Sequence, residues 1–375
     1  MKDNRATKGF SLKDQLFNRE KIGYLAGLFD GIFDTTAFET TVMERLLPLE
    51  LKARINMIAE VLETHLSNDF PKAVEQIQTA LPPELDPTKT DDDFGAFILA
   101  PLGVFVSNNG LGHVDISLKL LREMTKRFSV EFDIRHFINV HPEATMTALK
   151  SWAVDDNYHV RRLVSEGTRP VLPWGKKIGL EVHEPLAFLD VLHSDHTRYV
   201  TRSVANHLND ITKKRPELVI ETLKRWAKQG KQNKAELDWM TRHALRTLVK
   251  KGNRDALELL GYHGAPAIKV SELRFSPKVV LIGDVAQFEF EITASRTENL
   301  MIDYVIEFTK KNGSTAPKVF KLKKLAVKAG ETVSLTKNHR FLKDATTFTH
   351  YPGAHRVHLQ INGQKFSPCD FELRT

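Results

Sequence analysis

Cysteine is nearly absent from this sequence: among 375 residues the chain holds Cys369 alone. One thiol excludes an internal disulfide framework and a zinc site built from cysteines. No run of about eighteen apolar residues occurs, which excludes a transmembrane helix, and the amino terminus leads into no apolar stretch like that of a signal peptide. These absences predict a soluble, cytoplasmic protein of a reducing compartment.

Motifs for metals and nucleotides are also missing. The fifteen histidines include no HExxH sequence, and residues 103–112 carry glycines without the dinucleotide-binding fingerprint. His193 and His196 have a spacing that could ligate a metal, but the sequence singles out no third ligand for them. We therefore expect neither a metal site nor a cofactor.

Charge is divided unevenly along the chain. Residues 1–150 carry 17 Lys+Arg and 22 Asp+Glu, residues 151–265 carry 20 and 14, and residues 266–375 carry 17 and 11. The three parts therefore contribute −5, +6 and +6 to the overall +7. A basic surface favours a polyanion such as nucleic acid, although a solvated surface without any partner can have the same composition.

Three segments spaced by forty residues share one pattern, in which an arginine stands two places after one apolar residue and two places before another. The segments are Val160–Glu166, Val200–Asn206 and Met240–Arg246. A period of about forty residues is typical of paired-helix repeats of the HEAT and armadillo kind, which offer a long concave surface. The pattern predicts a mainly α, helical-repeat fold.

Two stretches of the amino-terminal part are less regular. Pro48 interrupts an apolar stripe of helical spacing that runs from Met43 to Ile58, which favours two short helices over one. The apolar stretch from Phe94 to Leu111 lacks a clear period, and we assign no structure to it.

The pattern changes after residue 265. Gln287–Ile292 and His355–Ile361 alternate between apolar and polar residues, as half-buried strands do. The second of these runs into Asn362-Gly363, a strong hairpin signal, because both central residues of a type I′ turn need positive φ. About seven short strands in this region predict an immunoglobulin-like β-sandwich. We thus expect a HEAT-like helical-repeat domain over 1–265 and the sandwich over 266–375.

Glu166 is the one carboxylate at its position of the repeat, since the other copies carry Asn206 and Arg246. On a helix that ends at Gly167 in the left-handed conformation, Arg162 and Glu166 would share a face. They could form an ordinary surface ion pair worth about 0.3–0.5 kcal/mol. A carboxylate among the repeated arginines would, however, weaken polyanion binding, which favours a specific function for Glu166.

The run from Asp155 to Gly175, which reads DDNYHVRRLVSEGTRPVLPWG, resembles the AlkC branch of the AlkC/AlkD DNA alkylation repair glycosylases. Segments Phe10–Phe17 and Arg202–Asp210 are similar to that branch as well. The resemblance implies HEAT-like repeats that cradle DNA and, as in some AlkC members, an immunoglobulin-like domain at the carboxyl end.

It also implies excision of N3-alkylated bases, chiefly 3-methyladenine and 3-methylcytosine, from double-stranded DNA, by chemistry that needs no cofactor. The superfamily is associated with catalysis that does not need the base in a deep pocket, whereas most base-processing enzymes flip their target, and the sequence leaves both alternatives open. We expect a monomer, because a solenoid capped at both ends needs no partner to close it. By its motif position Glu166 would stabilise an oxocarbenium-like sugar and position a water, with Glu131 and Asp210 as further catalytic carboxylates. Residues expected to bind DNA are Arg161, Arg162, Arg169, Trp174, Arg202, Asn206, Arg242 and Arg246. The alternative from another class is a non-enzymatic repeat scaffold that binds DNA or a protein.

Overall fold

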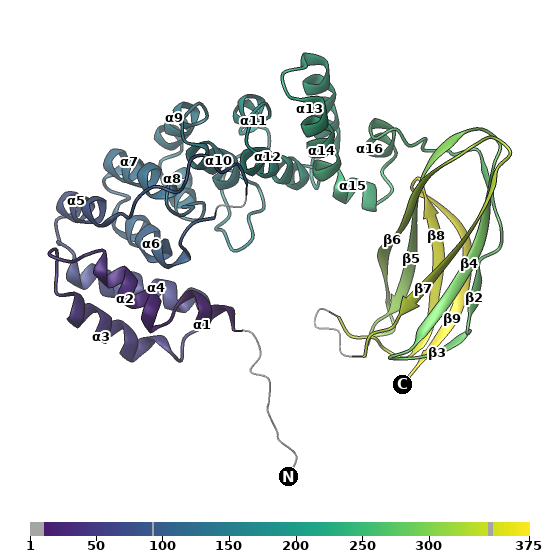
Figure 1. Ribbon diagram of the computed structural model, residues 1–375, viewed down its shortest axis with the longest axis horizontal. Coiled ribbons are helices and arrows are strands. Elements are labelled where there is room, and N and C mark those ends of the chain that lie inside the picture. Colours follow the sequence, from purple (N-terminus) through teal and green to yellow (C-terminus); the bar gives the residue numbers. More distant parts are fainter. Residues whose placement is uncertain (1–10, 92–93, 344–347) are drawn as a thin grey trace, which may run out of the picture. The chain divides into compact units, whose positions relative to one another are not determined.

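Helices make up the chain as far as Leu259, and strands make up the chain from Ile268 onward, in this computed structural model (Figure 1). The structure describes residues 11–91, 94–343 and 348–375, so that Phe10 of the amino-terminal motif lies outside the described residues. The change from helix to strand that the sequence predicts after residue 265 is confirmed. By compactness the chain divides into one unit of 1–211 with 226–240 and a second unit of 212–225 with 241–375.

The α-helices described in this part are 5 to 15 residues long. In chain order they are α1 (Leu12–Leu16), α2 (Arg19–Gly27), α3 (Thr35–Leu46), α4 (Leu51–His65), α5 (Phe70–Ala80), the 3₁₀ helix η1 (Phe97–Leu99), α6 (Ala100–Asn109), α7 (Val114–Thr125), α8 (Ile134–Val140), α9 (Pro142–Trp152), α10 (Tyr158–Gly167), α11 (Leu186–Leu192), α12 (Arg198–Ile211), α13 (Pro216–Gln229), α14 (Lys234–Ala244), α15 (Arg246–Lys250) and α16 (Arg254–Leu259).

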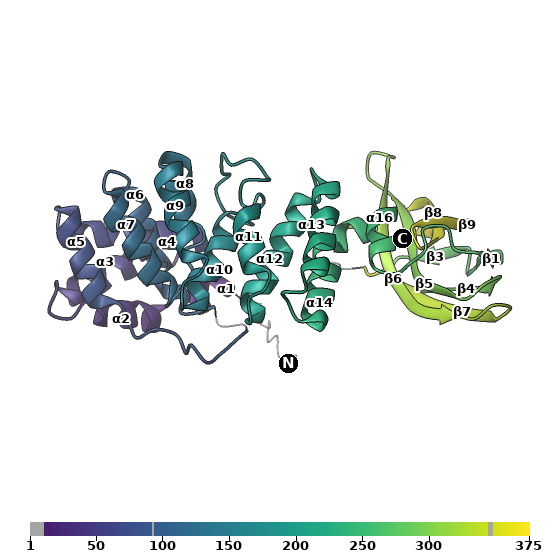
Figure 2. The same ribbon diagram turned by 90° about the horizontal axis from the view of Figure 1, so that it is seen from above.

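The three copies of the forty-residue pattern are the helices α10, α12 and α14. The apolar residues on either side of each arginine are fully buried, namely Val160, Val164, Val200, Val204, Met240 and Ala244. Figure 2 shows α10, α11 and α12 side by side, and the three pack against one another. The prediction of three repeated helices is therefore confirmed. Their apolar residues share a buried face, because residues four apart on a helix point to one side.

Two local predictions have different outcomes. The break at Pro48 is confirmed, since α3 ends at Leu46 and α4 begins at Leu51. The expectation that Gly167 takes a left-handed conformation is wrong, because Gly167 is the last helical residue of α10 and has no positive φ. Its lack of a side chain serves packing instead: an added Cβ would lie 2.6 Å from Cγ2 of Ile134.

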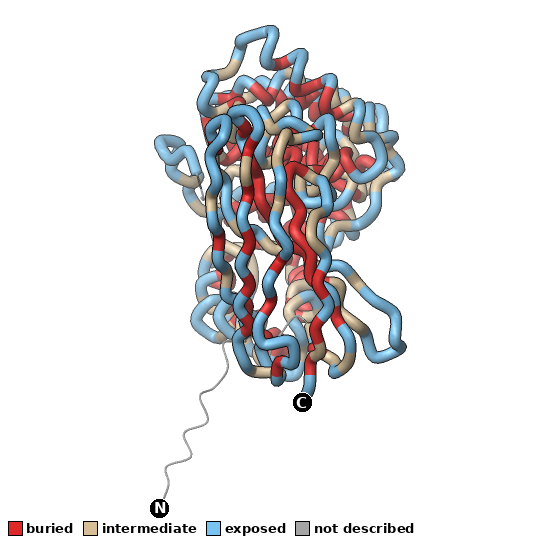
Figure 3. Tube along the Cα trace, turned by 90° about the vertical axis from the view of Figure 1, so that its right-hand side faces the viewer, coloured by how far each residue is buried: buried red, intermediate tan, exposed pale blue. Residues whose placement is uncertain are grey.

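The strands form two sheets that enclose one apolar core. One sheet holds β1 (Ile268–Val270), β2 (Arg274–Ser276), β4 (Val285–Ala294) and β7 (Thr332–Arg340), and the other holds β3 (Val279–Leu281), β5 (Glu298–Thr309), β6 (Thr315–Val327), β8 (Gly353–Ile361) and β9 (Gln364–Arg374). Buried and exposed residues alternate along β4, whereas β5 and β8 are buried over much of their length. Figure 3 shows buried and exposed stretches in the strands. The described residues of this region form nine strands where about seven were expected, because β1, β2 and β3 are too short to show a period.

Two glycine-bearing turns of the second unit meet at unusually close range. The β8–β9 hairpin turns at Asn362 and Gly363, whose φ angles of 46° and 83° are the positive values that the sequence predicted. Gly252, which follows α15 and has a φ of 72°, lies against this turn. A Cβ on Gly252 would be 2.8 Å from the Cα of Gly363, so neither position has room for a side chain. The turn is further tied down by Asn362 Nδ2, which donates to the carbonyl of His263 (3.0 Å).

Candidate active site

Helix α10 is buried along its whole length, from Tyr158 to Gly167. Asn157 caps its amino end, where the Asn157 side chain accepts a hydrogen bond from the backbone N–H of His159 (2.9 Å). A helix without an exposed face must satisfy its charged side chains internally, because a buried unpaired charge is costly. Arg162 and Glu166 are therefore not the surface ion pair that their spacing allows.

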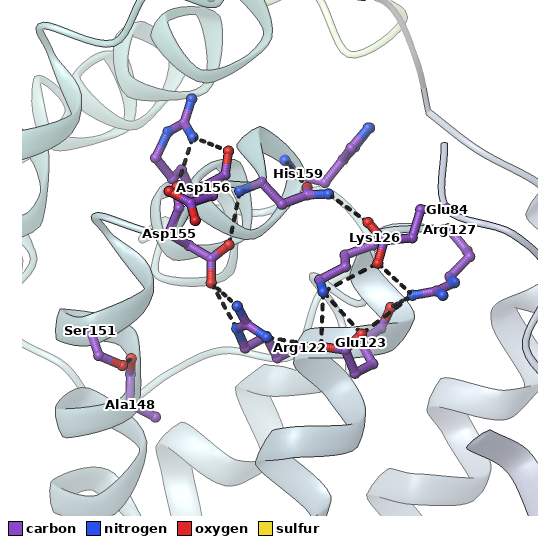
Figure 4. Close-up of polar contacts among 12 residues, drawn as sticks. Glu84, Arg122, Glu123, Lys126, Arg127, Ala148, Ser151, Asp155, Asp156 and His159 are labelled. Carbon is purple, nitrogen blue, oxygen red and sulfur yellow. Dashed lines mark hydrogen bonds and ion pairs between the residues drawn. The ribbon is translucent and has the colours of Figure 1, made fainter. Parts of the chain in front are cut away.

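A network of ion pairs supports the segment that leads into α10 (Figure 4). Arg122 donates through Nε to Oδ2 of Asp155 (2.7 Å), and Oδ1 of Asp155 accepts from the backbone N–H of Asn157 (2.9 Å). The side-chain amide of Asn157 in turn donates a hydrogen bond to Glu84 (3.3 Å), which also forms an ion pair with Lys126 (3.3 Å). Charges from three separate segments thus fix the residue at which α10 begins.

Glu166 lies at the end of α10 and is 5% exposed. Its Oε1 accepts a 2.6 Å hydrogen bond from Nη1 of Arg169, and its Oε2 accepts a 2.6 Å hydrogen bond from Oγ of Ser203 on α12. Nη2 of Arg162 lies 3.7 Å from Oε2. Each carboxylate oxygen has two acceptor positions, so both oxygens keep capacity for a further donor.

Arg162 joins Glu166 to a second predicted carboxylate. Its Nη1 donates to Oε2 of Glu131 (2.5 Å) and to Oγ of Ser129 (2.8 Å), while Ser129 also donates to Glu131 (2.9 Å). The guanidinium lies 4.7 Å from the ring centroid of Tyr199, a cation–π distance. Arg162 is thereby held on several sides.

Arg169 joins Glu166 to the third predicted carboxylate, since its Nε donates to Oδ2 of Asp210 on α12 (2.9 Å). Arg135 holds the backbone at this point through hydrogen bonds from Nη1 to the carbonyls of Gly167 (2.8 Å) and Arg169 (2.9 Å). The result is a continuous chain in the order Glu131, Arg162, Glu166, Arg169, Asp210. The structure thus brings together all three carboxylates that the sequence analysis named.

These contacts determine the protonation states of the residues in this series of ion pairs. Burial by itself would raise the pKa of Glu166, but the charges of Arg162 and Arg169 and the hydrogen bond from Ser203 outweigh it and hold the pKa below its ordinary value. Burial would lower the pKa of Arg162, yet Glu131 and Glu166 raise it above its ordinary value. The same balance raises the pKa of Arg169 beside Glu166 and Asp210. Glu166 is therefore an anion at neutral pH despite its burial.

A further carboxyl group, Asp133, has the opposite character. Burial raises its pKa to about 7, although a hydrogen bond from Ser107 (3.2 Å) lowers it, and the charge of Glu131 adds to the increase. Asp133 is packed so closely against Gly103 that an added Cβ there would lie 2.2 Å from Oδ2. The Asp133 carboxyl therefore keeps its proton to a higher pH than an ordinary aspartate does.

The remaining arginines differ in their surroundings. Arg161 is buried and donates to both oxygens of Asp195 (2.5 and 3.2 Å) and to the carbonyls of Asp155 and Asp156 (2.8 and 3.0 Å). A buried guanidinium with four of its five N–H donors used in this way fits a structural role better than the DNA contact predicted for it. Arg202 is less buried and forms an ion pair with Asp91.

Trp174 is 57% exposed and has a φ of 65°, which is rare for an aromatic residue. Its carbonyl accepts a hydrogen bond from Nζ of Lys52 (3.0 Å), and the same Nζ lies 6.0 Å from the ring centroid. An observed backbone outlier of this kind often marks a functional position. Asn206 is partly exposed on α12, whereas Arg242 and Arg246 belong to the second compact unit.

Sequence reasoning did not single out the hydroxyl and aromatic groups that complete the site. Ser203 follows the repeated Arg202, and Ser129 stands two places before Glu131. Serine at these places carries no recognisable pattern, because its role depends on a partner in another helix. Tyr199 had a weak signal, since it lies one residue before the apolar start of the second repeat copy.

Comparison with known proteins identifies the family. Residues 269–375 match the family described as "Uncharacterised protein YhaZ, C-terminal Ig-like domain". The chain is 39% identical to "Uncharacterized protein YhaZ" of Bacillus subtilis (strain 168) over 272 residues, which are 72% of this chain and 75% of that protein. It also matches the structure of "Pseudomonas fluorescens alkylpurine DNA glycosylase AlkC bound to DNA containing an abasic site analog", with a TM-score of 0.85 and 33% identity over 98% of this chain and 100% of the other. This chain belongs to the AlkC branch.

Membership of the AlkC branch confirms the predicted combination of helical repeats and a carboxyl-terminal immunoglobulin-like domain. Among the described residues no group of three or more His, Cys, Asp or Glu side chains has the arrangement of a metal site. No helix in the described ranges is long and apolar enough to cross a membrane. His193 instead stacks on Trp226, with ring centroids 4.3 Å apart.

Proposed function

We propose that this protein is a DNA glycosylase that hydrolyses the N-glycosidic bond of N3-alkylated bases, chiefly 3-methyladenine and 3-methylcytosine, in double-stranded DNA. The observation that carries the proposal is the ion-pair chain that joins Glu131, Glu166 and Asp210 through two arginines. Burying such a series of charged side chains costs solvation free energy, and the ion pairs contribute little net stability. The series therefore indicates a functional role. The AlkC structure supports the proposal, since an abasic site is what remains when a base is removed.

The chemistry requires few groups. Alkylation at a ring nitrogen leaves the base cationic. When the C1′–N bond breaks, its electron pair goes to the base, which leaves as a neutral molecule, and positive charge develops on the sugar. A water then bonds to C1′ and releases a proton. A carboxylate beside the sugar stabilises this charge and accepts a hydrogen bond from the attacking water.

Glu166 has the properties that this role needs. It is ionised although it is 5% exposed, and a charge in such surroundings acts more strongly than one in bulk water. Arg169 and Ser203 each use one acceptor position on different oxygens, which leaves positions for water on both. Glu131 and Asp210 hold the two arginines and thereby fix the orientation of Glu166.

DNA contacts are proposed for the exposed rim of the site. Trp174 would pack on the nucleotide that carries the lesion, because an aromatic face attracts a cationic base. Arg202 and Asn206 would contact phosphates, as partly exposed basic and polar side chains on α12. Arg162 and Arg169 would act close to the sugar. We also propose that the base is not enclosed in a deep pocket, as the family resemblance implies.

The test is release of 3-methyladenine from methylated duplex DNA. We expect Glu166→Gln to lower the single-turnover rate by about 100-fold or more while DNA binding persists. Glu236→Gln is the matched control, since Glu236 is also an acceptor of arginine hydrogen bonds, from Arg198 Nε (2.9 Å). A rate within about twofold of wild type would remove Glu166 from the catalytic role. A wild-type protein that releases no methylated base would support the scaffold alternative.

A further inference from the structure

A cavity of about 680 Å³ lies within the second compact unit, between the α14–α15 region and the strands β5 and β6. Six basic residues line it, from two sides: Arg242, Arg246 and Lys250 on the helices, and Lys321, Lys323 and Lys324 on β6. Its volume lies within the range of small-molecule sites, about 300–1,000 Å³. It contains none of the residues of the Glu166 chain.

The strand register shows which face of the sheet forms the wall. Lys321 stands opposite Asp303 and Lys324 stands opposite Met301. Neighbouring Ile302 and Tyr304 belong to the core between the sheets, whereas Met301 and Asp303 do not. The lysines opposite Met301 and Asp303 therefore project from the outer face of the sandwich, toward the helices.

The residues that line this cavity carry an excess of positive charge. Within the described parts of the chain no ion pair is formed by Arg242, Lys250, Lys321, Lys323 or Lys324. Asp303 is the one carboxylate among the described lining residues, and burial raises its pKa to about 6. Six cationic side chains beside one carboxylate repel one another, so an anion bound among them is stabilised.

The wall of the cavity is not uniformly polar, because Val249, Leu260, Met301, Val319 and Leu322 also line it. The ring of Tyr262 lies close by, with its centroid 5.9 Å from Nζ of Lys324. A duplex backbone presents charge and sugar but keeps its bases stacked inside. An apolar wall with an aromatic ring beside cations instead suits a phosphate that carries an exposed base.

We propose that this cavity binds an unpaired nucleotide, with the phosphate among the lysines and arginines and the base against the apolar wall and Tyr262. The shared chemistry is that of a free nucleoside monophosphate and of an unpaired nucleotide at the end of a DNA strand. This site is separate from the base-excision chemistry and does not depend on it.

Another explanation for the lysines is protection of a sheet edge. Strand β6 pairs with β5 alone and is the last strand of its sheet, and lysines commonly guard such edges against association. Edge protection accounts for Lys321, Lys323 and Lys324. It does not account for Arg242, Arg246 and Lys250, which face the same cavity from helices.

Calorimetric titration of the full chain tests the site. We expect deoxyadenosine monophosphate to bind at least tenfold more tightly than inorganic phosphate or deoxyadenosine. The double variant Lys321→Gln/Lys324→Gln should weaken this binding at least tenfold, and Tyr262→Leu should weaken nucleotide binding but not phosphate binding. Lys310→Gln/Lys311→Gln, at the turn that follows β5, is the control with the same loss of charge and should bind as wild type does.

Short adenine oligonucleotides distinguish the two sources of the nucleotide. Tighter binding of a 5′-phosphorylated single strand than of the monophosphate indicates a strand end, and the reverse indicates a free nucleotide. Equal binding of phosphate and the monophosphate, an unchanged affinity in the Lys321/Lys324 variant, or equal competition by a blunt duplex would overturn the proposal. The Glu166→Gln variant should bind the nucleotide normally, so that failure here and failure of the glycosylase assay can be told apart.

Discussion

The Oγ of Ser203 donates a 2.6 Å hydrogen bond to Oε2 of Glu166, from α12 to α10. The same Oγ lies 2.9 Å from Oγ of Ser165. A hydroxyl has one proton, and a charged acceptor forms the stronger bond. The Ser203 hydroxyl therefore gives its proton to Glu166, the charged acceptor, in preference to Ser165. This hydroxyl orients one oxygen of Glu166 without adding a charge.

Replacing Ser203 by alanine should slow base release by about tenfold or more, because a hydrogen bond to a charged group contributes about 1.5–3 kcal/mol. Loss of the donor also raises the pKa of Glu166, so the acid limb of the pH–rate profile should move to higher pH. Ser203→Thr keeps the hydroxyl and should recover most of the rate, while Ser194→Ala, at an exposed serine, should change nothing. A slower enzyme with an unmoved acid limb would mean that Ser203 acts by packing alone.

Arg202→Ala should weaken DNA binding and lower the slope of log affinity against log salt by about one, the value for one lost phosphate contact. Fluorescence anisotropy over a salt series measures this slope. Arg161→Ala is the contrasting variant: loss of the partner of Asp195 should lower the thermal midpoint and leave the salt slope unchanged. If the Arg161 variant loses slope and the Arg202 variant does not, the two assignments must be exchanged.

Asp133 should make folding stability depend on pH in an unusual direction. The folded protein keeps the proton of this group up to about pH 7, whereas the unfolded chain releases it near 3.8. Stability from this group is therefore present below about pH 4 and is lost as pH rises toward 7, by up to about 4 kcal/mol. Asp133→Asn should flatten this part of the curve in denaturant titrations, and the exposed Asp115→Asn should not. A curve that stays equally steep in the asparagine variant would contradict the assignment.

Gly167→Ala should destabilise the fold by about 1–3 kcal/mol, because the new methyl group would overlap Cγ2 of Ile134. Gly27→Ala is the matched control. Gly27 is also the last residue of its helix, and a Cβ there meets nothing within 4 Å. The control should be neutral or slightly stabilising in chemical denaturation. Equal stability of the two variants would show that α8 moves away from α10 at little cost.

Periodic positions could be predicted from sequence because burial repeats with the geometry of the helix or strand. The spacing of Val160, Val200 and Met240 predicts three helices, and the alternation of Gln287–Ile292 predicts a strand. Neither prediction requires knowledge of the elements that pack against these segments. The segment Phe94–Leu111 could not be assigned, since it holds η1 and a short α6 that is apolar on nearly all sides.

Partners that lie far apart in the sequence could not be predicted in the same way. The spacing of Arg162 and Glu166 suggested a surface pair, whereas the stronger contact of Arg162 is to Glu131, 31 residues away. Arg169 likewise reaches Asp210, 41 residues away. The family resemblance named these carboxylates but not the contacts between them. Such contacts depend on how the helices pack, and a single sequence does not show that packing.

The contact between Gly252 and Gly363 bears on where the chain can be cut. A fragment that starts at 266, where the strands begin, would leave the β8–β9 turn without the backbone that covers it and Asn362 without the His263 carbonyl. Residues 241–265 thus support the folded sandwich through direct contacts and are more than a linker that precedes it. Autonomous folding is to be sought in a fragment that keeps them.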